Sequence, residues 1–353
     1  MAPRLRSPDH PAFTSNSEYL PAGSGRFDTR PDLFLRSAPV PPLAPSNEEL
    51  RSADCLETVD RVGDPATASF KAAARLHQAR WREAKQLPIG TQPISGGSRA
   101  RPLGSRLPLA YALESYANFI DPRCAQAARA RLAAPQRHQM LKADRLYADL
   151  LSSMPMCFNL FGTITEPAAA TAALRAWWPD VPGSVSEVIF EWSPGRADRA
   201  YLGNRTSFDV AFILDLGEGR RGVLGVETKY HEHPIPVGAT PENLPRYLEV
   251  ARASELFEES ALAALPRDTV SQLWLDHLLA LSMLQHRSGQ WHWARFALVY
   301  PDGNPAWAPL VARYRALLRD EQTFAALTFD QLIAAGALEA PVCDALIARY
   351  RCW

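Results

Sequence analysis

Cysteine is scarce in this sequence, and the few cysteines that occur are scattered. There are five of them, an odd number without any C-x-x-C pair: Cys55, Cys124, Cys157, Cys343 and Cys352. This pattern argues against a disulfide framework and against a structural zinc site. It favours a reducing compartment, and we predict a cytoplasmic protein.

Long apolar runs are also missing. No stretch approaches the ~20 apolar residues that span a bilayer, and the N-terminus lacks the basic and apolar regions of a secretory signal. We therefore predict no membrane partner. Neither sign of charge is in excess, because 38 Lys and Arg residues balance 38 Asp and Glu residues. The net charge thus gives no reason to expect a nucleic-acid or membrane partner, although local charge does.

The composition of the chain changes near residue 62. Residues 1–62 are rich in Pro, Ser and Arg without sustained periodicity, which predicts a disordered or loosely packed N-terminal arm. Residues 63–353 have the composition of a folded domain, with a basic helical part over 63–165 and the strands within 166–353. Helical patterns predict helices over 69–86, 125–134, 138–151 and 166–178.

Strand patterns dominate the next part of the chain. Residues 186–192 are rich in strand formers, residues 207–230 read as a β-hairpin, and residues 294–301 form a continuous apolar run. Two helices, over 241–259 and 269–285, are expected between the hairpin and this run, and terminal helices flank a short strand in TFAALTF. This order predicts an α/β fold with a mixed central sheet covered by helices on both faces.

The hairpin, SFDVAFILDLGEGRRGVLGVETKY, carries charged residues where its flanks are built for burial. With the turn centred on Gly217-Glu218-Gly219, Asp209 lies opposite Glu227, and Lys229 follows on the same face. The Arg220-Arg221 pair leaves a one-residue slip open, and that slip would separate the charges. In the unslipped register two carboxylates fall within about 5 Å of each other. Such a pair needs a proton, a salt bridge or a cation.

Paired carboxylates of this kind suit Mg²⁺ or Mn²⁺, which bind hard oxygen donors together with water and phosphate. The ion would stabilise charge on a phosphoryl oxygen and help to generate hydroxide. Lys229 would orient the attacking water or neutralise the transition state. The small residues Ala211 and Gly225 predict room for substrate above the carboxylates. A cross-strand ion pair at a sheet edge is the alternative that the residues leave open.

The segment FDVAFILDLGEGRRGVLGVETKY resembles the D…(D/E)-x-K core of the PD-(D/E)XK nuclease superfamily, which has the restriction-endonuclease-like fold. The wider run from FKAAARLHQARWRE through SSMPMCFNLFG, FEWSPGR and the hairpin to HLLALSM is similar to a bacterial group of restriction-endonuclease-like proteins. The resemblance implies that Asp209 and Glu227 are metal ligands, that the Thr228 carbonyl faces the metal and that Lys229 is the catalytic lysine. The proline of the family motif is replaced by Phe208, at a position that varies.

The resemblance also calls for a further acid upstream of the hairpin. Glu191 in FEWSPGR is our choice, and Glu187, four residues earlier on the same face, is the second candidate. An exposed glutamate at a strand end is the structural alternative for Glu191. Arg196 is expected either to contact phosphate or to cap the turn that follows.

Polar residues beside the hairpin offer weaker signals. His231 and His233 could form a zinc pair, but no third ligand has suitable spacing, so a solvated strand end is our interpretation. Gln272, on the helix expected over 269–285, is a candidate to project toward the site, as a polar residue on this helix does in some relatives, but a surface glutamine is the interpretation we adopt. Asn159, in CFNLFG, is expected to satisfy backbone groups within a packed connector.

A local excess of basic residues supports nucleic-acid binding. Lys71, Arg75 and Arg82 fall roughly on one side of the helix expected over 69–86, in a segment whose only acid is Glu83. We predict a phosphate-binding surface there, with a solvated helix face as the alternative. The leading function is a metal-dependent endonuclease of DNA. The competing functions are a non-catalytic nucleic-acid-binding or interaction protein on the same fold, and a zinc hydrolase. With one site per chain, duplex cleavage would require a dimer or two successive nicks.

Overall fold

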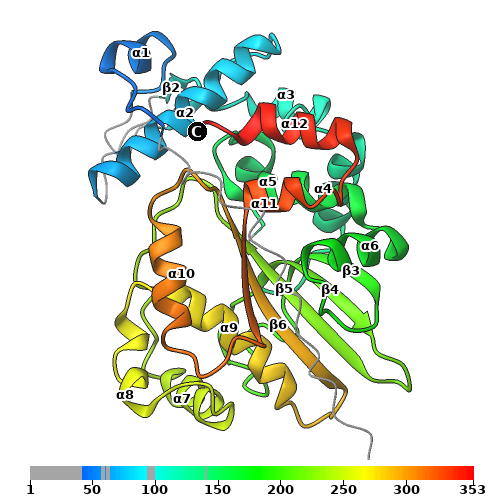
Figure 1. The fold of residues 1–353 in the computed structure, drawn as a ribbon. Coiled ribbons are helices and arrows are strands. Elements are labelled where there is room, and N and C mark those ends of the chain that lie inside the picture. The colour runs from blue at the N-terminus through cyan, green and yellow to red at the C-terminus, as the bar shows by residue number, and fades with distance from the viewer. Residues whose placement is uncertain (1–41, 57–59, 61–63, 94–99, 140) are drawn as a thin grey trace, which may run out of the picture. The chain divides into compact units, whose positions relative to one another are not determined.

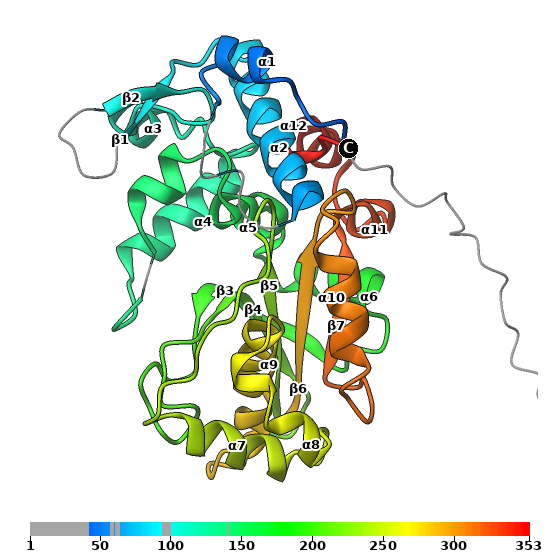
Figure 2. The same ribbon diagram turned by 90° about the vertical axis from the view of Figure 1, so that its left-hand side faces the viewer.

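A five-stranded sheet organises the computed structural model, which describes residues 42–56, 60, 64–93, 100–139 and 141–353 (Figures 1 and 2). Its order is β3 (Ser184–Trp192), β4 (Phe208–Asp215), β5 (Arg221–Thr228), β6 (Trp291–Tyr300) and β7 (Phe324–Thr328). The first three strands are antiparallel neighbours, whereas β6 and β7 run parallel to β5. The mixed sheet confirms the predicted α/β fold.

Side-chain alternation gives the sheet two buried faces. Ala211, Ile213 and Val223 pack under α7 (Leu244–Ala253), α9 (Ser271–Leu284) and α10 (Trp307–Arg315). Phe212 and Leu224 face α5 (Ser153–Phe161), α6 (Pro167–Trp177), α11 (Phe329–Ala334) and α12 (Ala340–Tyr350). Figure 1 shows the two groups of helices on either side of the strands. Because both faces are covered, the strands read as near-continuous apolar runs.

The N-terminal part is helical, as expected. It contains α1 (Asn47–Ser52), α2 (Pro65–Ala84), α3 (Leu109–Ser115) and α4 (Pro122–Ala133), with a two-stranded ribbon of β1 (Gly90–Pro93) and β2 (Ala100–Leu103). The sequence did not predict α1, which lies within the expected arm. Its apolar side chains and those just after it pack against α2 and are buried there, namely Leu50, Ala53 and Cys55 against Leu76 and Ala79. Residues 1–41 lie outside the described part, so the arm and its boundary at residue 62 stay a prediction.

The helix expected over 138–151 is wrong. Among the described residues of this segment, only a π-helical turn, η2 (Asp144–Ala148), forms, between His138 with φ +63° and the extended Asp149. A new helix, α5, then begins because the Ser152 side chain accepts a hydrogen bond from the Met154 N–H. The expected connector CFNLFG lies mostly in α5. Asn159 does satisfy backbone groups, since it binds the Ile120 N–H and the Asn118 carbonyl.

Short helical elements occur in two of the remaining connections. A 3₁₀ turn, η3 (Gly162–Ile164), follows α5, and the segment between α7 and α9 holds α8 (Glu259–Leu262) and η4 (Leu265–Arg267). The helix expected over 241–259 is thus broken into α7 and α8. None of the described helices is both long and apolar enough to cross a bilayer.

Candidate active site at the β4–β5 hairpin

The hairpin has the unslipped register that the turn residues predict. Val210 pairs with Val226 and Ala211 with Gly225, so Asp209 comes next, opposite Glu227. The turn is set by three successive residues with positive φ, namely Gly217 (+80°), Glu218 (+56°) and Gly219 (+73°). Glycine takes this conformation without a steric penalty, and the Arg220-Arg221 pair causes no slip.

Asp209 is held by the end of the neighbouring strand. Its Oδ2 accepts a hydrogen bond of 2.8 Å from the Thr228 N–H. The N–H and C=O of a strand residue point to the same side, so the Thr228 carbonyl also faces β4. The other neighbour of Thr228 is β6, where the Lys229 N–H donates to the Val299 carbonyl. Asp209 and the Thr228 carbonyl therefore lie together at the open end of the β4–β5 pair, opposite its turn; we call this place the corner of the hairpin.

Glu227 receives two donors on one oxygen. Lys229 Nζ lies 2.6 Å and Gln272 Nε2 lies 3.0 Å from Glu227 Oε1. Gln272 therefore faces the site, and the interpretation of it as a surface glutamine is wrong. The ion pair is largely desolvated, because the Lys229 and Glu227 side chains are 8% and 11% exposed. The charges are thus close and on one face, in the arrangement expected from the register.

Asp209, Glu227 and Lys229 form a buried cluster in which acidic side chains outnumber basic ones. Burial and the charges of Glu227 and Glu191 raise the pKa of Asp209 well above its usual range, against the lowering effect of Lys229. Burial lowers the pKa of Lys229, but Glu227 and Glu232 outweigh it and raise that pKa above its usual range. Lys229 is therefore a cation at neutral pH, and the carboxylates favour any further positive charge that enters.

A cavity of about 390 Å³ opens over these residues; we call it the acidic pocket. It is lined by acids, by basic residues and by a few apolar and hydroxyl side chains: Arg145, Ser153, Met154, Glu191, Arg205, Thr206, Ser207, Asp209, Glu227, Lys229, Glu232, Ile235, Val237, Gln272, Leu275 and Asp276. The sequence reading missed Arg145, Arg205, Glu232 and Asp276. For Asp276 a signal existed, because it follows Gln272 by one helical turn of α9.

Glu191 reaches the acidic pocket and Glu187 does not. Glu187 is exposed opposite Ile213, whereas Glu191 lies beside the β4 end with φ +46°, an uncommon value for a non-glycine residue. Ser207 Oγ donates to its Oε1 over 3.1 Å. Burial raises the pKa of Glu191, opposed by the charge of Arg196. Of the two candidate acids, Glu191 is the one that the fold brings to Asp209.

Arg196 supports the backbone of Glu191. Its side chain is 3% exposed, and its Nη2 donates to the Glu191 carbonyl over 2.9 Å while Nη1 donates to Gln136 over 2.6 Å. Arg131 of α4 reaches the same carbonyl over 3.3 Å. The capping role is the one that these contacts favour, and a phosphate contact by Arg196 has little support.

The basic surface expected on α2 does not form. Arg75 is buried and binds both carboxylate oxygens of Asp60, and Lys71 lies 3.4 Å from the same group. Arg82 is buried and donates to the carbonyls of Gly104 and Leu87. A buried guanidinium needs such partners, so these residues hold the N-terminal part together instead of facing solvent.

The expected space above Ala211 and Gly225 is filled. Ala211 is fully buried, and a Cβ added at Gly225 would lie 2.4 Å from the Phe208 ring. Gly225 therefore admits an aromatic ring, not a substrate. Open volume lies instead at the strand ends, around Asp209 and Glu227.

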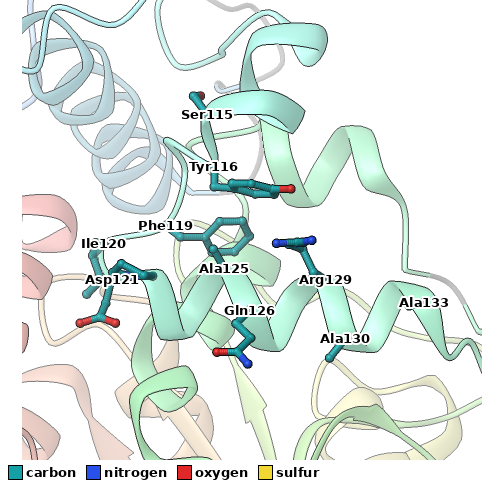
Figure 3. Close-up of a pocket in the computed structure, with 11 residues that line it drawn as sticks. Ser115, Tyr116, Phe119, Ile120, Asp121, Ala125, Gln126, Arg129, Ala130 and Ala133 are labelled. Atoms are coloured by element: carbon teal, nitrogen blue, oxygen red, sulfur yellow. The ribbon is translucent and has the colours of Figure 1, made fainter.

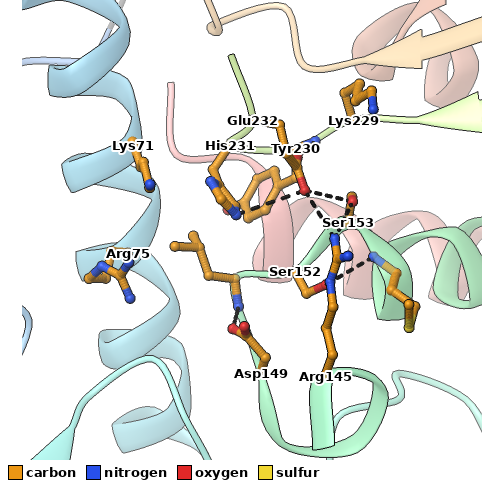
Figure 4. Close-up of polar contacts among 12 residues, drawn as sticks. Lys71, Arg75, Arg145, Asp149, Ser152, Ser153, Lys229, Tyr230, His231 and Glu232 are labelled. Carbon is orange, nitrogen blue, oxygen red and sulfur yellow. Dashed lines mark hydrogen bonds and ion pairs between the residues drawn. The ribbon is translucent and has the colours of Figure 1, made fainter. Parts of the chain in front are cut away.

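His231 and His233 are not gathered into a zinc site. Among the described residues, no group of three or more His, Cys, Asp or Glu side chains has the placement of a metal site. His231 lies 3.8 Å from Glu232, whose Oε1 accepts from Ser153 Oγ over 2.7 Å. Figure 4 shows this network, with Arg145 extending toward Ser153 and Glu232, and with Lys71 on the separate helix α2.

A larger cavity, of about 790 Å³, lies along α4 and shares no lining residue with the acidic pocket. Figure 3 shows Arg129 reaching from α4 toward the rings of Tyr116 and Phe119. The Arg129 guanidinium lies 5.2 Å from the centre of the Tyr116 ring. This cavity holds neither of the paired hairpin carboxylates.

The free oxygen atoms of the acidic pocket decide whether a divalent ion fits. Asp209 Oδ1 and Glu227 Oε2 have no hydrogen bond from the described residues, since the hydrogen bonds to these two carboxylates use Oδ2 and Oε1. The buried Asp276 Oδ2 also has no hydrogen-bond partner among them. Two carboxylates and a main-chain carbonyl, completed by water and phosphate, form an oxygen set that suits Mg²⁺.

A comparison with known protein families places the chain. The family model described as the PD-(D/E)XK nuclease superfamily matches residues 64–352. No curated protein and no solved structure matches the chain.

Proposed function

The chain belongs to the PD-(D/E)XK nuclease superfamily, and from this premise we propose that it is a metal-dependent nuclease that hydrolyses phosphodiester bonds of DNA. The single observation that carries the proposal is the shared corner of Asp209, Glu227 and Lys229, where the Thr228 N–H fixes Asp209 and Lys229 lies 2.6 Å from Glu227. Both the family and this geometry support a nucleic-acid substrate.

Each residue of the corner has a role in the proposal. Asp209 Oδ1, Glu227 Oε2 and the Thr228 carbonyl would hold Mg²⁺ or Mn²⁺, and Glu191 would hold a water ligand or a second ion. When bound, the ion supplies Lewis-acid stabilisation of the charge that develops on the phosphoryl oxygens. Gln272 keeps Glu227 Oε1 oriented, as a partner of a metal ligand does.

Lys229 acts as a cation in this reaction. The charges of Glu227 and Glu232 raise its pKa and so favour the protonated ammonium group. It would donate hydrogen bonds to the attacking water and to the phosphoryl oxygens, which become more negative in the transition state. Attack in line with the leaving oxygen adds the elements of water across the P–O bond, and the leaving oxygen receives a proton.

Plasmid cleavage tests the proposal. Supercoiled DNA is incubated with purified protein and Mg²⁺ or Mn²⁺, in parallel with Asp209→Ala and Lys229→Ala. Glu187→Ala is the matched control, because Glu187 is an exposed acid on β3 outside the acidic pocket. We expect nicking by the wild type and the control, and none without metal.

Three outcomes would count against the proposal. Nicking that persists in both site variants would show that another site or a contaminant is responsible. Binding of nucleic acid without cleavage, across metals and across DNA and RNA, would favour a non-catalytic protein on the same fold. Stoichiometric zinc in the purified protein would favour the hydrolase centred on His231 and His233.

A further inference from the structure

Arg145 lines the acidic pocket and is anchored there while remaining half exposed. We propose that it binds a phosphate group of the substrate strand beside the scissile phosphate, and so positions the strand over Asp209 and Glu227. This inference rests on the proposed nuclease function. It assigns the phosphate contact to η2, in place of the surface expected on α2.

The charge balance of the pocket creates the need for such a residue. Five acids line the pocket, namely Glu191, Asp209, Glu227, Glu232 and Asp276. Lys229 is paired with Glu227 at 2.6 Å and is 8% exposed. A phosphodiester carries a negative charge on every residue, so a strand that enters meets repulsion from these acids. The metal ion would offset the charge of its own ligands, Asp209 and Glu227, and a basic side chain other than Lys229 is suited to offset the remaining repulsion at the mouth of the pocket.

The anchoring of Arg145 leaves one edge of its guanidinium group open. Nε donates to Ser152 Oγ over 2.7 Å, and Nη2 donates to Ser153 Oγ over 3.5 Å and lies 3.6 Å from Glu232 Oε1. No hydrogen bond to a described residue uses Nη1, and the side chain is 48% exposed. Figure 4 shows the group held between these partners. An arginine oriented in advance loses little freedom when its planar fork meets a phosphate.

The local backbone explains why the side chain is directed there. Arg145 lies in η2, a wide π-helical turn, and π-helical turns occur often at functional sites. Ser152 and Ser153, the residues that anchor Arg145, begin α5, and Ser153 also binds Glu232 just after β5. The start of α5, seven and eight residues further along the chain, and the distant segment after β5 thus converge on the guanidinium group of Arg145.

The other arginines near the site are less suited to this role. Arg131 and Arg196 are committed to the Glu191 carbonyl. Arg205 lines the pocket and is exposed, but it forms no hydrogen bond or ion pair with the described residues, so its ordering would cost more side-chain entropy. Arg129 is exposed as well, but it lines the separate cavity along α4. Arg145 is anchored by hydrogen bonds, is half exposed and lies at the acidic pocket.

Binding and kinetics of Arg145 variants test the inference. A short fluorescein-labelled DNA duplex, its single strand and the matching RNA are titrated with Asp209→Asn protein, which cannot cleave, from ~50 to ~200 mM salt. In this background Arg145→Ala should weaken binding about tenfold, and the slope of log affinity against log salt should fall by about one. In the otherwise wild-type protein, the same change should raise KM and leave kcat nearly unchanged.

Three further variants separate binding from folding. Arg145→Lys keeps the charge but not the fork, so the salt slope should stay while KM rises partway. Ser153→Ala loosens the anchor, so KM should rise while the slope is kept. Arg129→Ala is the matched control, an exposed arginine at the other cavity, and it should leave both unchanged. If Arg145→Ala fails to fold, the first two variants decide.

The outcomes distinguish this inference from the proposed function. Wild-type protein that neither cleaves nor binds any of the three nucleic acids would overturn both. Wild-type protein that cleaves, with an unchanged KM and salt slope in Arg145→Ala, would overturn only the role of Arg145. Equal losses in Arg145→Ala and Arg129→Ala would overturn it too, because binding would then reflect general charge.

Discussion

The carboxylate of Asp209 accepts a hydrogen bond from the main-chain N–H of Thr228, at 2.8 Å. Asp209 is the second residue of β4 and Thr228 ends β5, so a side chain occupies the place that a backbone acceptor takes further along the hairpin. The contact leaves Oδ1 without a hydrogen bond from the part of the chain that the structure describes, and the Thr228 carbonyl points to the same side as its N–H. One hydrogen bond therefore orients two of the oxygens that we assign to the metal.

The first prediction concerns Asp209→Asn. Activity should fall by about 10³-fold or more, because the variant loses a ligand that stabilises charge in the transition state. The melting temperature should be equal or higher, because burial and like charges already disfavour the ionised form of Asp209. Cleavage assays and thermal melts measure the two effects. A large loss of stability together with retained activity would contradict the assignment.

The second prediction separates the two candidate acids on β3. Glu191→Gln should lower the cleavage rate about tenfold or more, since Glu191 faces Asp209 across the acidic pocket. Glu187→Gln should cleave like the wild type, because Glu187 is exposed. Initial rates at saturating Mg²⁺ measure both. Equal rates in the two variants would remove Glu191 from the site.

The third prediction concerns Gln272, which donates to Glu227 Oε1. Gln272→Ala should raise the Mg²⁺ concentration needed for half-maximal cleavage about tenfold, because partners of metal ligands tune metal affinity. Stability should change little, since the side chain is only partly buried. A Mg²⁺ titration of activity measures the shift. An unchanged requirement would limit Gln272 to packing.

The fourth prediction concerns Gly225 and the Phe208 ring. Gly225→Ala should destabilise the protein by about 1–3 kcal/mol, because the new Cβ would meet the ring at 2.4 Å. Gly222→Ala, on the same strand, has contacts no closer than 3.3 Å and should cost less. Urea denaturation measures both variants. Adding Phe208→Leu to Gly225→Ala should recover stability, and a lack of recovery would argue against the proposed clash.

The fifth prediction concerns pH and His277. Burial lowers its pKa from 6.5 to about 3, with its ring nitrogens near the Tyr314 and Thr323 hydroxyls. Between these pH values the unfolded chain binds a proton that the folded chain does not. Stability should therefore fall as pH drops below about 6.5, by up to about 1.4 kcal/mol per pH unit from this group.

Urea denaturation across this range, for the wild type and His277→Gln, measures the contribution. The variant should be less stable at neutral pH, because a buried packed ring is lost. Its stability should nevertheless depend less steeply on pH between about 6.5 and 4. Parallel pH profiles for the two proteins would show that His277 does not carry the effect.

Local patterns allowed the hairpin to be predicted. Alternating apolar residues, Gly217 and Gly219 fixed the turn and register, and the register put Asp209, Glu227 and Lys229 on one face. The π-helical turn at η2 was not predicted, because the segment is rich in helix formers. Its helix is interrupted by the positive φ of His138 and the extended backbone of Asp149, and these conformations depend on the surrounding structure. The same holds for α1, whose apolar side chains are buried only because α2 is present.

Charge was the property that the sequence described least well. Spacing places Arg75 and Arg82 on one helix side with Lys71. In the structure both arginines are buried, where Arg75 pairs with Asp60 and Arg82 donates to a backbone carbonyl. Gln272 and Asp276 lie on the expected helix, and only its packing on the sheet turns them toward Glu227.

The sequence by itself determined the order of helices and strands along the chain, the hairpin register and the three charged residues of the hairpin end, because these follow from interactions between near neighbours in the chain. Tertiary structure decided which acid on β3 joins them, which glutamine binds Glu227 and which arginine faces the pocket. Those choices depend on contacts between residues far apart in the chain, such as the hydrogen bond between Gln272 and Glu227, which are 45 positions apart. Side-chain type and spacing along the chain do not show which distant residues will meet. In the folded state, buried charged and polar groups must have partners, and this requirement selects those contacts.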